Sequence, residues 1–276
     1  MSVPMRGDIG LSFDSEMVRK TYDAWGDPLA SPARGDVKSV YSRTVRGWGY
    51  RCPELATDAL VRAIRAGAVR LPTRGARFLD VGCGDGLQAE SLKSAGLLAG
   101  EDVRLCGMDI SERLLAVARG AGRYHSLVCD DLNRCDADAE VDVATARFEN
   151  DAFHVSFCVG VLTYVDPDAY AGGGKGKNRR NLLRELARVS SEAVIFTCRT
   201  DMCAPWERAA QALVDESVWR PLEPPSTVPY LPGNASYHDK GVEARLFAFA
   251  ASEPPRTPRD ADGPARGSNE RSYELS

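Results

Sequence analysis

One short stretch, residues 77–86, constrains the fold of this chain more than any other. It reads Arg-Phe-Leu-Asp-Val-Gly-Cys-Gly-Asp-Gly, so an apolar run leads directly into a turn with three glycines. Glycine tolerates positive φ angles and lets a ligand approach the backbone without meeting a side chain. A helix that starts after such a turn presents unpaired N–H groups to an anionic ligand group. The stretch therefore predicts a buried strand, a glycine turn and a helix that together bind a ligand.

Two ligand-binding turns and one purely structural turn compete to explain this pattern. A dinucleotide fingerprint needs the spacing G-x-G-x-x-G/A, and the bulky Leu87 stands where its third small residue belongs. The observed order is G-x-G-x-G, with Asp80 two positions before Gly82. The spacing disfavours a nicotinamide-dependent dehydrogenase. It leaves open a tight strand-to-helix turn that binds nothing.

Strand-like and helix-like segments alternate after this turn. The expected strands are 103–108, 127–129, 153–161 and 193–197, and the expected helices are 87–95, 111–119 and 179–189. Such alternation predicts βαβ units and a parallel sheet, and in such a sheet a ligand lies outside the carboxyl ends of the strands. We expect an α/β, Rossmann-like, doubly wound fold.

Acidic residues recur where the first three of these strands end. Asp80 lies in the first strand, Asp109 closes the second, and Asp130 with Asp131 follows the third. Each has a structural alternative, because Asp109 can cap the next helix and the Asp130–Asp131 pair can be solvated loop carboxylates. The ordered series is more specific than any single member.

With these motifs, residues 77–198 resemble the core of the class I methyltransferases that use S-adenosylmethionine (SAM). The matching segments are 79–86, 107–111, 129–132, 157–165 and 182–189. The resemblance implies SAM binding and a seven-stranded, mostly parallel sheet whose last strand is antiparallel. Two features depart from the family: Ser-Ser-Glu-Ala at 190–193 replaces the usual Pro-Gly-Gly turn, and 172–176 is a glycine-rich insertion.

A narrower resemblance involves three flanking segments. Residues 22–25, 50–53 and 197–200 are similar to parts of the methyltransferase-like proteins of the Williams–Beuren syndrome chromosomal region. That resemblance implies no established substrate.

The resemblance also assigns roles to individual residues. The glycine turn would hold the methionine end of SAM, Asp109 would accept hydrogen bonds from both ribose hydroxyls, and Ile110 would pack on the adenine. Asp130 would accept from the adenine amino group while the Asp131 N–H meets a ring nitrogen. Asp80 would anchor the turn and reach the ammonium group, directly or through water. The predicted cofactor-binding residues are Tyr22, Asp80, Gly82, Cys83, Gly84, Gly86, Asp109, Ile110, Asp130, Asp131 and Val159.

No catalytic residue is predicted. Placing an acceptor lone pair opposite the activated S–CH3 bond supplies most of the catalysis, and a base is needed only when the acceptor arrives protonated. His125 and His154 border apolar runs and are interpreted as structural, whereas His238 and Tyr164 are candidates for the acceptor side. Residues 158–161 read Cys-Val-Gly-Val, not an Asn-Pro-Pro-Tyr type of signature, which disfavours methylation of adenine or glutamine.

Composition narrows the partners. The 276 residues carry a net charge of −4, and Lys and Arg are spread along the chain, which disfavours nucleic acid as the main partner. No apolar run is long enough to span a bilayer, and the N-terminus lacks a signal-peptide core, so we expect a cytoplasmic protein without a membrane partner. The eight cysteines include no C-x-x-C pair, and we predict no metal site but buried, reduced cysteines.

The sequence thus predicts an N-terminal cap or lid (1–52), a methyltransferase core (53–251) and a disordered tail (252–276). The predicted function is SAM-dependent methyl transfer to an unidentified small-molecule acceptor. The alternative is a catalytically inert SAM-binding scaffold or sensor. Neither the acceptor atom nor the oligomeric state follows from the sequence.

Overall fold

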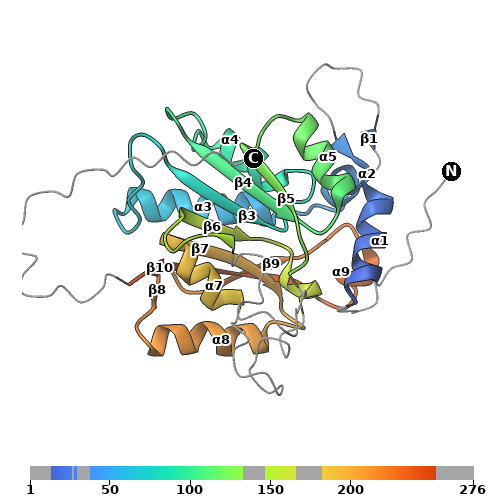
Figure 1. The fold of residues 1–276 in the computed structure, drawn as a ribbon. Helices are drawn as coiled ribbons and strands as arrows, with labels where there is room; N and C mark the ends of the chain where they lie inside the picture. Colours follow the sequence, from blue (N-terminus) through green and yellow to red (C-terminus); the bar gives the residue numbers. More distant parts are fainter. Residues whose placement is uncertain (1–13, 27, 30–37, 133–146, 166–181, 253–276) are drawn as a thin grey trace, which may run out of the picture.

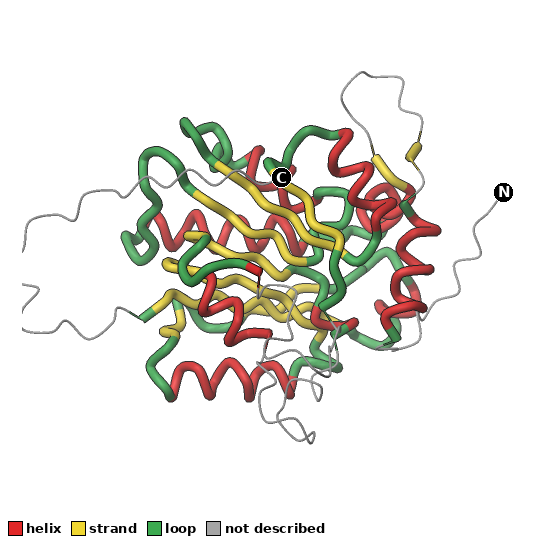
Figure 2. The backbone as a smooth tube through the Cα atoms, viewed as in Figure 1, coloured by secondary structure: helices red, strands yellow, loops and turns green. Residues whose placement is uncertain are grey.

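The computed structural model describes residues 14–26, 28–29, 38–132, 147–165 and 182–252. Within these ranges, a twisted sheet is covered by helices on both faces (Figures 1 and 2). A two-stranded ribbon, β1 (Pro28–Leu29) with β2 (Lys38–Ser39), lies apart from the sheet. The insertion at 172–176 and residues 253–276 of the predicted tail lie outside the described residues.

The described part of the main sheet has eight strands in the order β5-β4-β3-β6-β7-β10-β8, and β9 pairs with β10 beside β8. Their bounds are β3 (Arg77–Val81), β4 (Arg104–Asp109), β5 (Ser126–Cys129), β6 (Phe153–Cys158), β7 (Ser190–Arg199), β8 (Trp219–Pro221), β9 (Ser226–Pro229) and β10 (Glu243–Ala251). The strands β3 to β7 are parallel, and β10 is antiparallel to its neighbours. This confirms a mostly parallel sheet with an antiparallel last strand.

The predicted number of seven strands was one too few. Strand β8 pairs with the end of β10 near Phe249, and β9 pairs with its beginning near Ala244. The two short strands therefore share one edge position, and the sheet is seven strands wide. Both contain proline, which an edge strand tolerates because proline has no N–H to donate.

Side chains that alternate along the strands bury the sheet on both faces. Phe78 packs into a cluster with α3 (Cys52–Arg65) and α4 (Leu87–Ser94). Its neighbour Leu79 packs into the opposite cluster with α7 (Leu182–Val189) and α8 (Ala204–Asp215). Because helices cover both faces of the sheet, side chains on both sides of these strands are buried. This explains why the sequences of the strands are nearly continuous apolar runs.

Local signals in the sequence set the helix boundaries. Pro53 stands in the first turn of α3, where its missing N–H costs nothing. Ser111 caps α5 (Glu112–Gly120), and its side chain accepts from the Leu114 N–H. Gly86 precedes α4 with φ of 104°, so the glycine turn leads directly into a helix.

The N-terminal helices α1 (Ser15–Trp25) and α2 (Val40–Gly47) lie where the parallel strands end, at the right of Figure 1. Helix α1 packs against α5 and α2. The short helix η2 (Leu162–Tyr164) follows β6, and α9 (Ala235–His238) lies on the same side as α1. Three segments that are far apart in the sequence therefore meet at the carboxyl ends of the strands.

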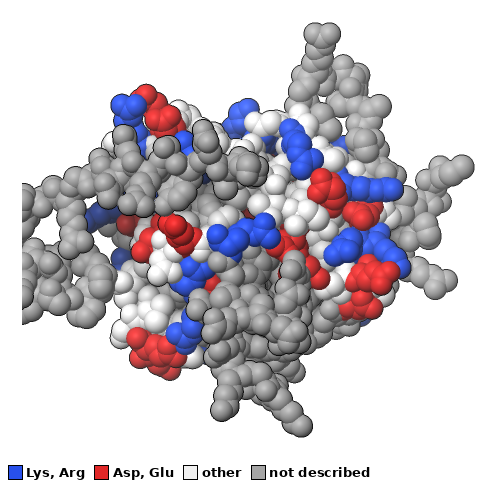
Figure 3. Space-filling view, in the orientation of Figure 1, with Lys and Arg blue, Asp and Glu red and all other residues white. Residues whose placement is uncertain are grey.

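The surface and the cysteines add two observations. Basic and acidic side chains are intermixed over the described surface that faces the viewer in Figure 3. No helix within the described ranges has the length and apolar character to cross a membrane. Of the seven described cysteines, all free, six are buried as expected; Cys129 at the end of β5 is exposed, because β5 is an edge strand.

Candidate functional site

The glycine turn after β3 is held by β4. The N–H groups of Gly82 and Cys83 both donate to the Met108 carbonyl, at 2.7 and 3.0 Å. Gly82 has φ of 71°, and a Cβ added there would lie 2.0 Å from Cγ2 of Val161. Both the conformation and the lack of space therefore require glycine at position 82.

Asp80 lies beneath this turn, not in a cavity. Its side chain is buried, and Oδ2 accepts a hydrogen bond of 2.6 Å from the Tyr124 hydroxyl. Room for the Tyr124 ring comes from Gly107, where a Cβ would lie 2.8 Å from that ring. Burial raises the pKa of Asp80 to about 7, although the hydrogen bond from Tyr124 opposes this rise.

Asp109, at the end of β4, ties two turns together. Its Oδ2 accepts from the Gly84 N–H and its Oδ1 from the Ser111 N–H, each at 2.9 Å. Burial raises the pKa of Asp109 to about 6, against the opposing effect of these backbone hydrogen bonds. The group is therefore mainly a carboxylate at neutral pH. A carboxylate has lone pairs beyond the two used here, so it can still accept from a ligand.

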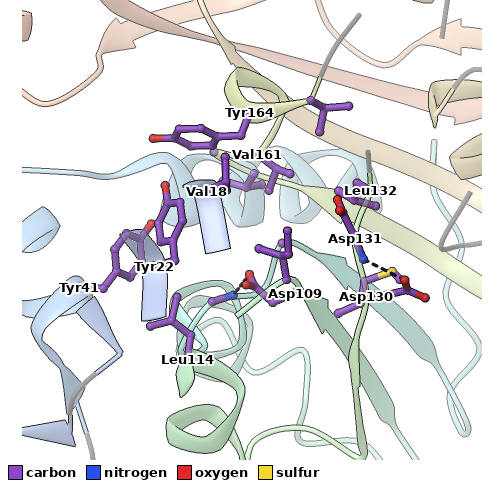
Figure 4. A pocket seen from close by; sticks show the side chains of 17 residues that line it. Val18, Tyr22, Tyr41, Asp109, Leu114, Asp130, Asp131, Leu132, Val161 and Tyr164 are labelled. Atoms are coloured by element: carbon purple, nitrogen blue, oxygen red, sulfur yellow. Dashed lines mark hydrogen bonds between the residues drawn. The ribbon is translucent and has the colours of Figure 1, made fainter. Parts of the chain in front are cut away.

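A cavity with about 650 Å³ of free space, open to solvent, lies above this turn. Figure 4 shows its side chains converging from α1, α2, α5, the ends of β4 and β5, and η2. The described residues that line it are Val18, Tyr22, Tyr41, Gly82, Gly84, Met108, Asp109, Ile110, Leu114, Asp130, Asp131, Leu132, Val159, Gly160, Val161, Tyr164 and Val165.

Two neighbouring acids, Asp130 and Asp131, form one end of this cavity (Figure 4). Oδ1 of Asp130 accepts from the Asp131 N–H at 2.9 Å, and Oδ2 pairs with Arg147. The Asp130 carboxylate and the Asp131 N–H, which are predicted to bind adenine, are therefore hydrogen-bonded to each other. Binding of adenine would replace this hydrogen bond with hydrogen bonds to the ligand.

Three tyrosines form the opposite end of the cavity. The Tyr22 ring lies edge-on to both Tyr41 and Tyr164, with centroid distances of 5.7 and 5.5 Å. Such T-shaped contacts are favourable arrangements of aromatic rings. Burial raises the pKa values of all three hydroxyl groups above the ordinary value, so they stay protonated at neutral pH.

Eight of the predicted cofactor-binding residues line this single cavity. They are Tyr22, Gly82, Gly84, Asp109, Ile110, Asp130, Asp131 and Val159. The other three, Asp80, Cys83 and Gly86, do not line it, because they lie within or beneath the turn. The position of Asp80 therefore suits anchoring the turn and does not suit a direct contact with a ligand. The cofactor contacts themselves stay predictions.

Sequence reasoning missed the partners that complete the site. Tyr41 and Val161 line the cavity, and Tyr124 holds Asp80. Val161 lies within the family-like segment 157–165, but no role was assigned to it. No motif marks Tyr41 or Tyr124, because both are brought to the site by tertiary packing. Of the histidines, His154 accepts from the Arg77 N–H at 2.9 Å, which supports its structural interpretation, and none of the described cavity-lining residues is histidine.

Comparison with known proteins identifies the fold and the cofactor. A family model described as "Methyltransferase domain" matches residues 79–197, which run from β3 to β7 and include the turn and all the acids of the cavity. This segment is a class I methyltransferase domain. The match confirms the broader resemblance predicted from the sequence; the narrower one, to the Williams–Beuren region proteins, stays a prediction.

One sequence relative and one solved structure are similar to parts of this chain. Human methyltransferase-like protein 27 is 37% identical over 87 residues, which cover 32% of this chain and only 31% of the human protein. The crystal structure of the [4+2]-cyclase SpnF has a TM-score of 0.51 and 15% identity, and the alignment covers 90% of this chain and 99% of SpnF. At that identity the likeness shows the fold alone.

The residues of the methyltransferase domain fit its cofactor, SAM. Gly82 and Gly84 line the cavity without side chains of their own, and Asp109 is an anionic acceptor beside them. SAM carries positive charge on its sulfonium and ammonium groups, which suits a cavity lined by three carboxylates. Within the described ranges, no group of three His, Cys, Asp or Glu side chains is placed to hold a metal ion.

Proposed function

We propose that this protein transfers the methyl group of SAM to a small-molecule acceptor. One observation carries the proposal: a single cavity joins the glycine turn and Asp109 to a wall of three tyrosines. Aromatic and aliphatic side chains line this cavity together with a few polar groups, as is usual for small-molecule sites. The cytoplasmic location expected from the sequence belongs to the same proposal.

The two ends of the cavity have different proposed roles. The turn holds the methionine part of the cofactor, and Asp109 holds the ribose. The Asp130 carboxylate and the Asp131 N–H form hydrogen bonds with the adenine. The tyrosine end, formed by Tyr22, Tyr41 and Tyr164, holds the acceptor. This division follows from the chemistry of each end, since hydroxyl and amine groups need acceptors whereas an apolar ring needs apolar contacts.

SAM supplies an activated methyl group when it is bound. The chain's own contribution is then placement: the rigid turn fixes one reactant and the tyrosine wall orients the other. Holding two reactants in attack geometry accounts for a large part of enzymatic rate enhancement.

Isothermal titration with SAM tests the first half of this proposal, and screening acceptors with methyl-labelled SAM tests the second. We expect a saturable binding heat and repeated transfer of label. Absence of any binding heat would refute the cofactor role. Binding without turnover on any acceptor would favour the inert scaffold or sensor, a distinction that the fold cannot make because SpnF, a cyclase, shares it.

A further inference from the structure

We infer that the acceptor is an uncharged heteroaromatic molecule that is methylated on a pyridine-type nitrogen among Tyr22, Tyr41 and Tyr164. The inference rests on the proposed methyl transfer and adds the class of substrate. Three independent features of the cavity lead to it: the shape of the aromatic wall, the charge around it and the protonation of its hydroxyl groups.

The aromatic wall favours a flat ring. Tyr22 comes from α1, Tyr41 from α2 and Tyr164 from η2, and Trp25 extends the cluster with its centroid 6.1 Å from that of Tyr41. Val18, Val161 and Val165 add aliphatic surface between these rings. A planar aromatic molecule can contact ring edges and faces here in the geometry that aromatic pairs prefer.

The charge of the cavity disfavours an anionic acceptor. Asp109, Asp130 and Asp131 line the same space as the tyrosines. A phosphate or carboxylate on the acceptor would lose its hydration and meet like charge, and both effects oppose binding. Aromatic faces attract cations instead, so the same surroundings favour a reaction whose product is positively charged.

A nearby cation does not change this conclusion. Arg199, at the end of β7, lies behind the wall against the rings of Tyr230 and Tyr237, at 5.8 and 4.9 Å from their centroids. Its guanidinium forms two hydrogen bonds with Asp201, at 3.1 and 2.5 Å. Its charge is thus balanced by a carboxylate, and Arg199 does not line the cavity.

The protonation of the tyrosines favours an acceptor that keeps its protons. Because burial raises their pKa values, the hydroxyl groups of Tyr22, Tyr41 and Tyr164 donate hydrogen bonds and are poor bases at neutral pH. Asp109 already accepts from two backbone N–H groups, and Asp130 pairs with Arg147. An alcohol or a protonated amine would need a base before it could attack, whereas a pyridine-type nitrogen carries a free lone pair.

The transfer is balanced without a proton. The nitrogen lone pair forms the new bond to the methyl carbon while the sulfur–methyl bond breaks, and that electron pair remains on sulfur. Positive charge moves from sulfur to the ring nitrogen. The tyrosine rings line the end of the cavity that receives this charge, and aromatic faces attract a cation, which stabilises the transition state and the N-methylated product.

Binding of defined probes to the full chain saturated with S-adenosylhomocysteine (SAH) tests the inference by calorimetry. Quinoline is flat, uncharged and has a pyridine-type nitrogen; quinoline-2-carboxylate adds only a negative charge. We expect quinoline to bind about tenfold more tightly than the carboxylate. With trideuteromethyl-labelled SAM, mass spectrometry should detect labelled N-methylquinolinium, and 2-naphthol, which must lose a proton, should stay unmethylated.

Matched variants locate the binding site. Tyr164→Leu should weaken quinoline binding about fivefold, whereas Tyr164→Phe, which keeps the ring, should change it less than about twofold. The SAH affinity reports whether each variant is folded. Equal binding of the carboxylate, methylation of 2-naphthol in place of quinoline, or failure of quinoline to bind the SAH complex would each overturn the inference and leave the proposed cofactor role intact. Failure of SAH itself to bind would overturn both.

Discussion

The two ends of the cavity are built in opposite ways. The turn is held in place mainly by backbone groups, because the N–H groups of Gly82, Cys83 and Gly84 all donate hydrogen bonds to Met108 or Asp109. At the tyrosine wall, the described contacts are mainly between rings that come from α1, α2 and η2. A backbone-built end tolerates few substitutions, whereas a side-chain-built end can change with its substrate.

Two serine–aspartate pairs join these ends. The Ser39 hydroxyl donates to Asp85 Oδ2 at 2.5 Å, and the Ser111 hydroxyl donates to Asp23 Oδ1 at 2.6 Å. Each serine also caps a helix, α2 and α5 respectively. The N-terminal helices are thus tied to the loops that follow β3 and β4, so the tyrosine wall takes its position from the turns.

The largest effect should come from breaking the backbone-built end. In Gly82→Ala the new Cβ meets Val161, and alanine resists the positive φ. We expect a loss of about 3–5 kcal/mol of unfolding free energy and loss of SAM binding, measured by urea denaturation and calorimetry. Gly96→Ala is the matched control, because Gly96 has φ of 77° and nothing within 4 Å of its Cβ position; an equal loss there would mean that strain alone explains the effect.

Removing the Asp109 carboxylate should have the next largest effect. Asp109→Ala leaves the Gly84 and Ser111 N–H groups without their acceptor and removes the proposed ribose contact. We expect SAM binding to weaken by about 1.5–3 kcal/mol, or one to two decades in Kd. Asp109→Asn, which keeps one acceptor oxygen, should lose less. Unchanged affinity in both variants would contradict the assigned role of the carboxylate.

The stability of the turn should depend on pH. The folded-state pKa values of Asp80 and Asp109, about 7 and 6, lie above the unfolded value near 4. At a pH between the unfolded and folded pKa values, the folded state binds more protons than the unfolded state. The free energy of unfolding therefore falls as the pH rises from the unfolded pKa to the folded pKa values. We expect the two groups together to lower the free energy of unfolding by about 3–4 kcal/mol between pH 5 and 7, measured by urea denaturation. Asp80→Asn should flatten the slope, and an unaltered slope in that variant would refute the assignment.

The smallest effect should come from the connection between the ends. Ser39→Ala removes the cap of α2 and the donor to Asp85, which should cost about 1–2 kcal/mol of unfolding free energy. Ser42→Ala is a control in the same helix, because Ser42 is also buried but its side chain does not contact Asp85. If the two variants lose the same stability, the Ser39–Asp85 pair does not connect the ends.

The same contrast explains what the sequence could predict. The turn, Asp109 and Asp130 lie within short motifs next to strands, so local patterns were enough to place them around one cavity. The roles of Tyr41 and Tyr124 depend on which distant segments pack together, and nothing in their local sequence marks this. The eighth strand was missed for a related reason, since the two short strands β8 and β9 pair separately with the two ends of β10.

Asp80 shows the limit of a motif. Its position in the sequence was read correctly, but the burial and the Tyr124 hydroxyl that determine its orientation come from other segments. The motif therefore predicted that Asp80 belongs to the turn, but it did not predict the direction of the Asp80 side chain.

A crystal structure of the full chain with SAH would test the central claim most directly. We predict that both ribose hydroxyls lie within hydrogen-bond distance of the Asp109 carboxylate, that the homocysteine part lies over Gly82 and Gly84, and that the sulfur faces the side of Tyr22 and Tyr164. SAH bound away from this cavity, or with its sulfur directed away from the tyrosines, would contradict the account.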